Sequence, residues 1–90
     1  MIKLLQTVTF KKKIKKLHLI RKTALDAEIK KIVTNPEIGM LKKGDLAGIR
    51  VHKFKILTQL YLLAYRYNNE SILLLALGSH QNFYDELKRN

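Results

Sequence analysis

The spacing of apolar residues at the start of the chain predicts a strand followed by a helix. Residues 2–8 are predicted as the strand. The helix is predicted to begin at Phe10, with the hydroxyl of Thr9 as its N-cap. Phe10, Ile14 and Leu17 form one apolar stripe at helical spacing, and lysines fill the remaining surface. Because neighbouring lysines repel one another, this helix needs its stripe packed against a core or an anionic partner.

A second helix is predicted after a break near His18. It begins at about Leu19 or Arg21 and ends at Val33. Pro36 ends this helix, because the residue before a proline avoids helical backbone angles. The face expected to be buried consists of Leu25, Ile29, Ile32 and Val33. The two helices are therefore expected to be antiparallel and joined by a short loop.

The second half of the chain is predicted to form strands. Residues 37–48 hold three of the four glycines and show no period, so they are predicted as a loop. Strands are expected over about 49–57, from 59 or 60 to 67, and over about 71–77. The last of these is apolar on both faces, which is typical of a central strand or one with both faces covered.

A short helix is predicted to end the chain, with Ser79 as its N-cap and Asn82 as the alternative. The predicted fold class is α+β, with two N-terminal helices packed on a small antiparallel sheet in the order β-α-α-β-β-β, followed by the short helix. No repeat, linker or change in composition divides the chain, so residues 1–90 are expected to form a single domain.

The charge of the chain narrows the class of partner. Eighteen lysines and arginines oppose seven carboxylates, which gives a formal net charge of +11. Such a balance favours nucleic acid, an acidic protein or an anionic membrane surface. The apolar stretch over 60–77 is interrupted by Arg66 and Glu70, so no membrane span is predicted. The chain has no cysteine, which fits the reducing cytoplasm, and a cytoplasmic protein is expected.

Several kinds of catalytic site are excluded by the residues present. The stretch GDLAG lacks the lysine and the spacing of a phosphate-binding loop. The three histidines have no ligand spacing and the carboxylates are few, so neither a metal nor another cofactor is expected. Metal-free cleavage of RNA stays feasible, because the 2′-hydroxyl attacks its own phosphate. The protein then needs only a base, an acid and cations.

The strands carry candidate groups for such a reaction. Alternation places Arg50 and His52 on one face of their strand, and Lys53 and Lys55 on the other. Arg66 lies near the end of the next strand. The pattern does not indicate which of the two faces is open. For Arg50 an ion pair, such as one with Asp45, is the alternative to a catalytic role.

The segment GSHQNFY adds a second set of candidates. His80 would lie at a helix start, where free backbone N–H groups favour phosphate, and Tyr84 four residues later lies on the same side. The alternatives are a surface histidine and an aromatic residue that packs the tail on the sheet. The lysines predicted to contact RNA on the first helix are Lys12, Lys13 and Lys16, with a merely solvated face as the alternative.

Four segments together resemble a known family. They are TFKKKIKKL (9–17), NPEIGMLKKGDLAGIRVHKF (35–54), YLLAYRY (61–67) and LLALGSHQNFY (74–84). In this order they resemble the RelE/ParE superfamily, the toxins of bacterial type II toxin–antitoxin systems. The resemblance implies a small basic toxin that an acidic antitoxin neutralises. It implies one of two targets: RelE-like members cleave mRNA on the ribosome without metal, and ParE-like members inhibit DNA gyrase without being enzymes.

The resemblance also assigns residues. The histidine and aromatic of one RelE-like subgroup's active site correspond to His80 and Tyr84, and two arginines common in the superfamily correspond to Arg50 and Arg66. Many members carry a further arginine where this chain has Leu62, for which Lys53 or Lys55 would substitute. We therefore predict catalytic roles for His80, Arg50, Arg66 and Tyr84, and RNA contacts for Lys53, Lys55, His52, Lys12, Lys13 and Lys16. The alternatives are gyrase inhibition and a nucleic-acid-binding module without toxicity.

Overall fold

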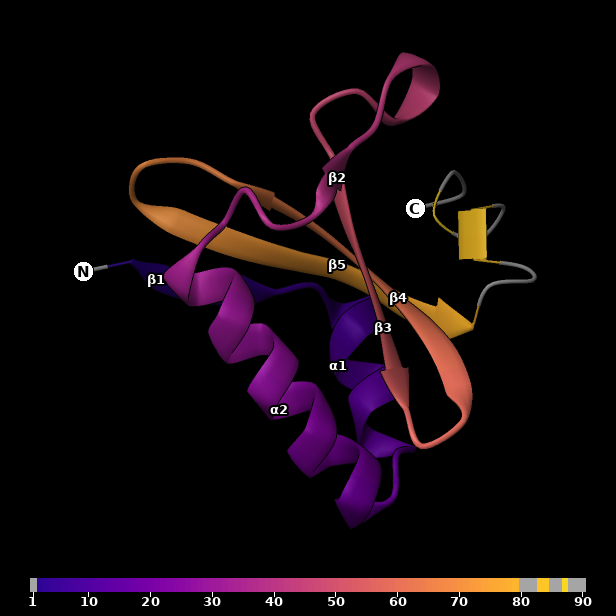
Figure 1. Cartoon of the computed structure of the whole chain (residues 1–90). Coiled ribbons are helices and arrows are strands. Elements are labelled where there is room, and N and C mark those ends of the chain that lie inside the picture. The colour runs from indigo at the N-terminus through magenta and orange to yellow at the C-terminus, as the bar shows by residue number, and fades with distance from the viewer. Residues whose placement is uncertain (1, 80–82, 85–86, 88–90) are drawn as a thin grey trace.

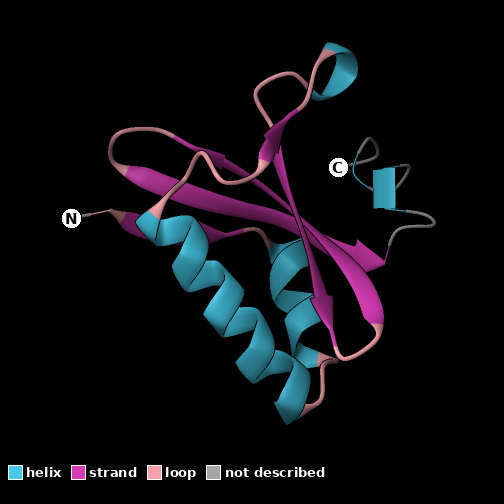
Figure 2. Ribbon diagram, viewed as in Figure 1, coloured by secondary structure: helices cyan, strands magenta, loops and turns pink. Residues whose placement is uncertain are grey.

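The fold consists of two helices on one face of a five-stranded sheet (Figures 1 and 2). The structure is a computed structural model that describes residues 2–79, 83, 84 and 87, with the backbone alone at Asp45. The elements are β1 (Lys3–Gln6), α1 (Val8–Lys15), α2 (Leu19–Thr34), β2 (Met40–Leu41), a short 3₁₀ helix (Gly44–Leu46), β3 (Arg50–Ile56), β4 (Gln59–Tyr67) and β5 (Ser71–Ser79). This confirms the α+β class and the predicted order of helices and long strands.

The sheet has the order β1-β5-β4-β3-β2 and is mixed. The last three strands form the expected antiparallel meander, and β2 pairs antiparallel with β3. The first strand instead pairs parallel with β5, with Lys3 opposite Ser71 and Gln6 opposite Leu74. The prediction of a purely antiparallel sheet was therefore wrong at β1. Because β1 takes the second edge of β5, that apolar strand is internal, as its sequence predicts.

Each face of the sheet carries an apolar cluster of its own. On the helix side, Phe10, Leu25 and Ile32 pack on residues of β3, β4 and β5, with Tyr65 at the centre of the sheet. We call the opposite side the open face. Its cluster consists of Ile49, Val51, Leu62, Ala64, Ala76, Phe83 and Leu87. Phe83 therefore packs the tail on the sheet.

The caps and faces of the helices differ from prediction in two places. The N-cap of α1 is Thr7, whose Oγ1 accepts the N–H of Phe10 at 3.1 Å and donates to the carbonyl of Leu75 at 3.0 Å. The prediction of Thr9 as the cap was wrong, because Thr7 also reaches β5 and Thr9 is exposed. In α2, Val33 is more than one third exposed and does not join the buried face.

The segment predicted as a loop contains β2 and the 3₁₀ helix. Only two residues of β2 pair with β3, too few to leave a periodic signal in the sequence. The predicted C-terminal helix lies mostly outside the described residues, together with Asn82. Phe83, Tyr84 and Leu87 are helical in the structure. None of the helices in the described part of the chain has the length and apolar character needed to cross a membrane.

Candidate functional site

The open face carries exposed cations. Lys53 and Lys55 lie on β3 and Arg66 lies on β4, and all three are exposed. Their cross-strand partners are apolar: Lys53 lies opposite Leu62, and Arg66 lies opposite Leu73. Since directly opposite residues of neighbouring strands share a face, these cations border the apolar cluster that Phe83 and Leu87 help to form.

A hollow of about 350 Å³ at the margin of the open face brings together two lysines and a tyrosine. Lys42 follows β2, Lys53 lies on β3, and Tyr84 belongs to the helical residues of the tail. The Nζ of Lys42 lies 5.2 Å from the centroid of the Tyr84 ring, in cation–π contact. Tyr84 is half-buried and meets Phe83 edge to face. This arrangement offers cations for a phosphate beside a ring for a base.

Sequence reasoning missed Lys42 as a site residue. It lies in the stretch without a period, and only the pairing of β2 with β3 brings it to this hollow. Its neighbour Lys43 gives an identical local signal, since both follow an apolar pair in the same loop. The sequence therefore contained a basic pair but no indication of which lysine meets Tyr84.

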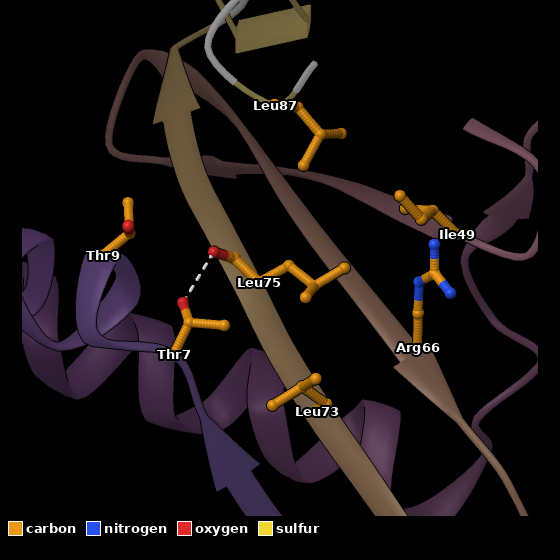
Figure 3. A pocket seen from close by; sticks show the side chains of 7 residues that line it. All are labelled: Thr7, Thr9, Ile49, Arg66, Leu73, Leu75 and Leu87. Atoms are coloured by element: carbon orange, nitrogen blue, oxygen red, sulfur yellow. Dashed lines mark hydrogen bonds between the residues drawn. The ribbon is translucent and has the colours of Figure 1, made fainter. Parts of the chain in front are cut away.

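Arg66 lines a separate hollow of about 470 Å³ on the same face (Figure 3). Its other walls are Thr7, Thr9, Ile49, Leu73, Leu75 and Leu87. The hydroxyl of Thr7 is already engaged with the carbonyl of Leu75, as the dashed line in Figure 3 marks. The structure therefore places Lys53 and Tyr84 together but Arg66 apart from them, in a mostly apolar surrounding.

Arg50 lies on the helix side of the sheet, opposite in register to Tyr65. Its Nη1 donates to the carbonyl oxygens of Gly39 at 2.8 Å and of Glu37 at 3.2 Å. Its guanidinium also lies 5.6 Å from the ring centroid of Tyr67. These contacts hold the loop before β2, so the structure does not support the catalytic role predicted for Arg50. The side chain of Asp45, its predicted ion-pair partner, lies outside the described part of the chain.

His52 is buried on the same side as Arg50, with 9% of the residue exposed. Its Nε2 lies 2.8 Å from Oε1 of Glu28 in α2. Burial opposes the charge of Glu28, but hydrogen bonds from His52 and Lys31 prevail and hold the pKa of that carboxyl below its usual value. An ionised carboxylate only accepts, so Nε2 of His52 donates. Although the ring borders the hollow of Lys53, its bond to Glu28 does not support the predicted RNA contact.

The remaining predicted residues lie elsewhere. Lys12, Lys13 and Lys16 are exposed on and directly after α1, which packs on the helix side. His80 lies outside the described residues and directly follows Ser79, the last residue of β5. Within the described residues, no group of three or more His, Cys, Asp or Glu side chains is placed to hold a metal ion.

The solved structures with this fold include three from bacteria. The intact RelBE toxin–antitoxin complex of E. coli matches with a TM-score of 0.71 and 18% identity, over 90% of this chain and 99% of the other. The isolated E. coli RelE toxin matches with a TM-score of 0.68 and 18% identity, over 99% and 98%. The protein HP0894 of Helicobacter pylori matches with a TM-score of 0.53 and 22% identity, over 89% and 96%.

At these identities the likeness establishes the fold alone. No curated protein sequence matches the chain. The sequence family described as ParE-like toxins of type II bacterial toxin–antitoxin systems, however, matches residues 4–88, nearly the whole chain. The protein therefore belongs to that family and is a type II toxin of the RelE/ParE superfamily.

Proposed function

We propose that this toxin is a ribosome-dependent, metal-independent endonuclease of mRNA in the bacterial cytoplasm. The observation that carries the proposal is the hollow lined by Lys42, Lys53 and Tyr84, in which Lys42 contacts the ring of Tyr84, in a fold similar to that of RelE. Cations beside a half-buried aromatic ring suit a single-stranded RNA, whose phosphates and unstacked bases are both accessible.

The reaction that fits these groups is an internal transfer at phosphorus. The 2′-oxygen bonds to phosphorus while a base takes its proton, and the bond to the 5′-oxygen breaks as an acid protonates that leaving group. The products carry a 2′,3′-cyclic phosphate and a 5′-hydroxyl. Lys53 and Lys55 would stabilise the negative charge that gathers on the phosphoryl oxygens. His80 is the proposed base or acid, and Tyr84 is the proposed stacking group.

Lys53 lies where it could replace the arginine that this chain lacks. Lys53 lies directly opposite Leu62, which takes the place of an arginine in many members of the superfamily. Leu62 is an uncharged side chain and is fully buried in the open-face cluster. The ammonium of Lys53, which lies directly opposite on the neighbouring strand, would then supply the missing cation.

The antitoxin we propose is an acidic protein with an amphipathic segment. One structure with this fold is that of RelE with its antitoxin RelB. The net charge of +11 calls for an acidic partner, and Ile38 and Met40 leave exposed apolar surface beside the lysines of the open face. A helix with one apolar and one acidic face would cover both features and so block the RNA site.

The test is induced expression in bacteria, followed within minutes by primer extension on abundant mRNAs and by a supercoiling assay on plasmid from the same cells. We expect discrete cuts that depend on translation, normal supercoiling, and loss of both cuts and growth arrest in the His80→Ala variant. Intact mRNA with impaired supercoiling would overturn the proposal in favour of gyrase inhibition. Cleavage that persists in His80→Ala would remove His80 from the reaction.

A further inference from the structure

The hollow proposed as the RNA site contains a methionine beside its lysines. Met40 lies on β2, is 67% exposed, and lines the hollow together with Lys42, Lys53 and Tyr84. The chain has no cysteine, and its only other methionine is residue 1. Sulfur-containing side chains are those that peroxides oxidise most readily in proteins. Met40 is therefore the one oxidisable sulfur of the chain after residue 1, and it borders the proposed site.

The pairing of β2 with β3 fixes where this sulfur lies. Met40 is directly opposite Val51, a residue of the open-face cluster, and directly opposite residues share a face. The N–H of Lys42 donates to the carbonyl of Ile49 at 2.9 Å, which continues the pairing by one residue. In extended backbone, residues two positions apart point to the same side. The side chains of Met40 and Lys42 are therefore held next to each other on the open face.

Two contacts connect the sulfur of Met40 to the ring of Tyr84. The ammonium of Lys42 donates to Sδ of Met40 at 3.7 Å, and the same ammonium lies 5.2 Å from the centroid of the Tyr84 ring. A thioether sulfur is a weak acceptor, so it competes only weakly with the ring for this cation. The strength of the acceptor at residue 40 therefore decides how far the Lys42 ammonium stays with Tyr84.

Oxidation replaces this weak acceptor with a strong one. A lone pair of the Met40 sulfur attacks one oxygen of hydrogen peroxide, a sulfur–oxygen bond forms, and the oxygen–oxygen bond breaks. The departing oxygen takes the proton of the transferred oxygen and leaves as water. The sulfur loses two electrons and the peroxide gains them. The product is methionine sulfoxide, a polar side chain whose oxygen accepts a charge-assisted hydrogen bond from an ammonium.

We propose that Met40 is an oxidation site that controls the hollow: its sulfoxide oxygen binds the ammonium of Lys42 and withdraws it from Tyr84. The consequence for RNA rests on the proposed function. The ring of Tyr84 then loses the cation that orients it, and the phosphate of a bound RNA loses part of its contact with Lys42. The oxidised toxin therefore binds single-stranded RNA more weakly. Methionine sulfoxide reductases restore the thioether, so the change is reversible.

The test treats the full chain with hydrogen peroxide and compares each variant before and after treatment. Mass spectrometry of the tryptic peptide 32–42 measures the gain of one oxygen at Met40. Proton NMR of the methylene group next to the Lys42 ammonium measures the transfer, because the ring current of Tyr84 shifts these protons upfield. Affinity is measured with a short 2′-O-methyl RNA, which lacks the attacking hydroxyl and is not cleaved.

Three variants separate the proposed contact from general oxidative damage. Met40→Leu retains an apolar side chain without sulfur, so peroxide should leave the affinity of this variant where it was before treatment. Lys42→Ala removes the group through which the sulfoxide acts, so oxidation of Met40 should cause no further loss in this variant. Lys43→Ala is the matched control, since Lys43 is the exposed neighbour in sequence, and it should respond to peroxide like the wild type.

We expect oxidised wild type to bind the RNA about fivefold more weakly, the lower end of what one stacked base contributes. The Lys42 methylene protons should move downfield, and the reductases should reverse both changes. Unchanged Lys42 protons in fully oxidised protein would overturn the proposal. An equal loss of affinity in Met40→Leu, or a further loss in oxidised Lys42→Ala, would do the same. A reduced toxin that binds no RNA would reject the proposed function alone, because the Lys42 protons still report the transfer.

Discussion

The hydroxyl of Tyr65 accepts a hydrogen bond from the backbone N–H of Gly39 at 2.9 Å. The same hydroxyl donates to the carbonyl of Pro36 at 2.6 Å. Burial raises the pKa of Tyr65, although the Gly39 N–H and the guanidinium of Arg50 act in the opposite direction. The phenol therefore stays protonated and keeps its donor. A Cβ at Gly39 would lie 2.7 Å from this oxygen, so glycine is required there.

Tyr65→Phe is expected to destabilise the fold by about 1–3 kcal/mol, because it leaves the N–H of Gly39 and the carbonyl of Pro36 without their partner. Urea unfolding with an unchanged m-value measures the effect. The matched control is Tyr67→Phe, whose hydroxyl makes one exposed contact of 3.4 Å with Glu37. That control should change stability by less than about 0.5 kcal/mol. Equal effects of the two substitutions would show that the Tyr65 hydroxyl does not anchor the loop.

Thr7→Ala is expected to destabilise the protein by about 1–2 kcal/mol, because Thr7 caps α1 and also ties its first turn to β5. Thr9→Ala is the matched control, since Thr9 is exposed within the first turn of the helix. Thermal unfolding of both variants measures the difference. A larger loss in Thr9→Ala than in Thr7→Ala would restore Thr9 as the residue that matters for the start of the helix.

The sequence predicted the parts of the fold whose apolar residues repeat at a clear period. Both helices and the three meander strands are such parts, and the two apolar faces of β5 predicted its internal place. The parallel pairing of β1 with β5 left no local signal, because it joins residues that are 68 positions apart, such as Lys3 and Ser71. The choice of Thr7 over Thr9 likewise depends on the distant carbonyl of Leu75.

The candidate site was less predictable for the same reason. Alternation correctly separated Arg50 and His52 from Lys53 and Lys55, but it did not indicate which pair the helices cover. The face that the helices cover is marked by the contact between Glu28 of α2 and His52 of β3, two residues that are 24 positions apart in the sequence. Sequence patterns describe which residues share a face. They do not describe what lies above that face.

Glu28→Gln is expected to lower stability at neutral pH by about 1.5–3 kcal/mol, the worth of hydrogen bonds to a charged group. The folded pKa of Glu28 lies below its unfolded value, so the stability it contributes is present above the unfolded pKa of about 4.3. That contribution is lost as the pH falls through the folded pKa. Urea unfolding from pH 7 to pH 3 should therefore show wild type and variant converging in acid.

Glu70→Gln is the control for this titration. Glu70 is exposed in the turn between β4 and β5, and no side chain of the described residues contacts its carboxylate. Its replacement should leave neutral-pH stability within about 0.5 kcal/mol of wild type. A difference between Glu28→Gln and wild type that stays constant down to pH 3 would contradict the role of the Glu28 charge.

Lys53→Ala is expected to slow mRNA cleavage at least about tenfold, because it removes a cation aimed at the charge of the transition state. The loss should be smaller than for a fully enclosed donor, since Lys53 is exposed and its field is screened by solvent. Primer extension on ribosome complexes with a stalled mRNA measures the rate. Lys30→Ala on α2 is the matched control and should cleave normally. A normal rate in Lys53→Ala would remove this lysine from the proposed site.

Arg50 provides a test that separates a structural role from a catalytic one. Arg50→Met keeps the aliphatic stem but removes the donors to the carbonyls of Glu37 and Gly39, so we expect a loss of about 1–3 kcal/mol. Cleavage per folded molecule should be unchanged, because the guanidinium lies on the helix side of the sheet. Arg50→Lys restores the charge without the fork of donors and should recover little of the stability. Cleavage that falls at least tenfold in Arg50→Met and returns in Arg50→Lys would instead mean that the charge of Arg50 acts on the RNA.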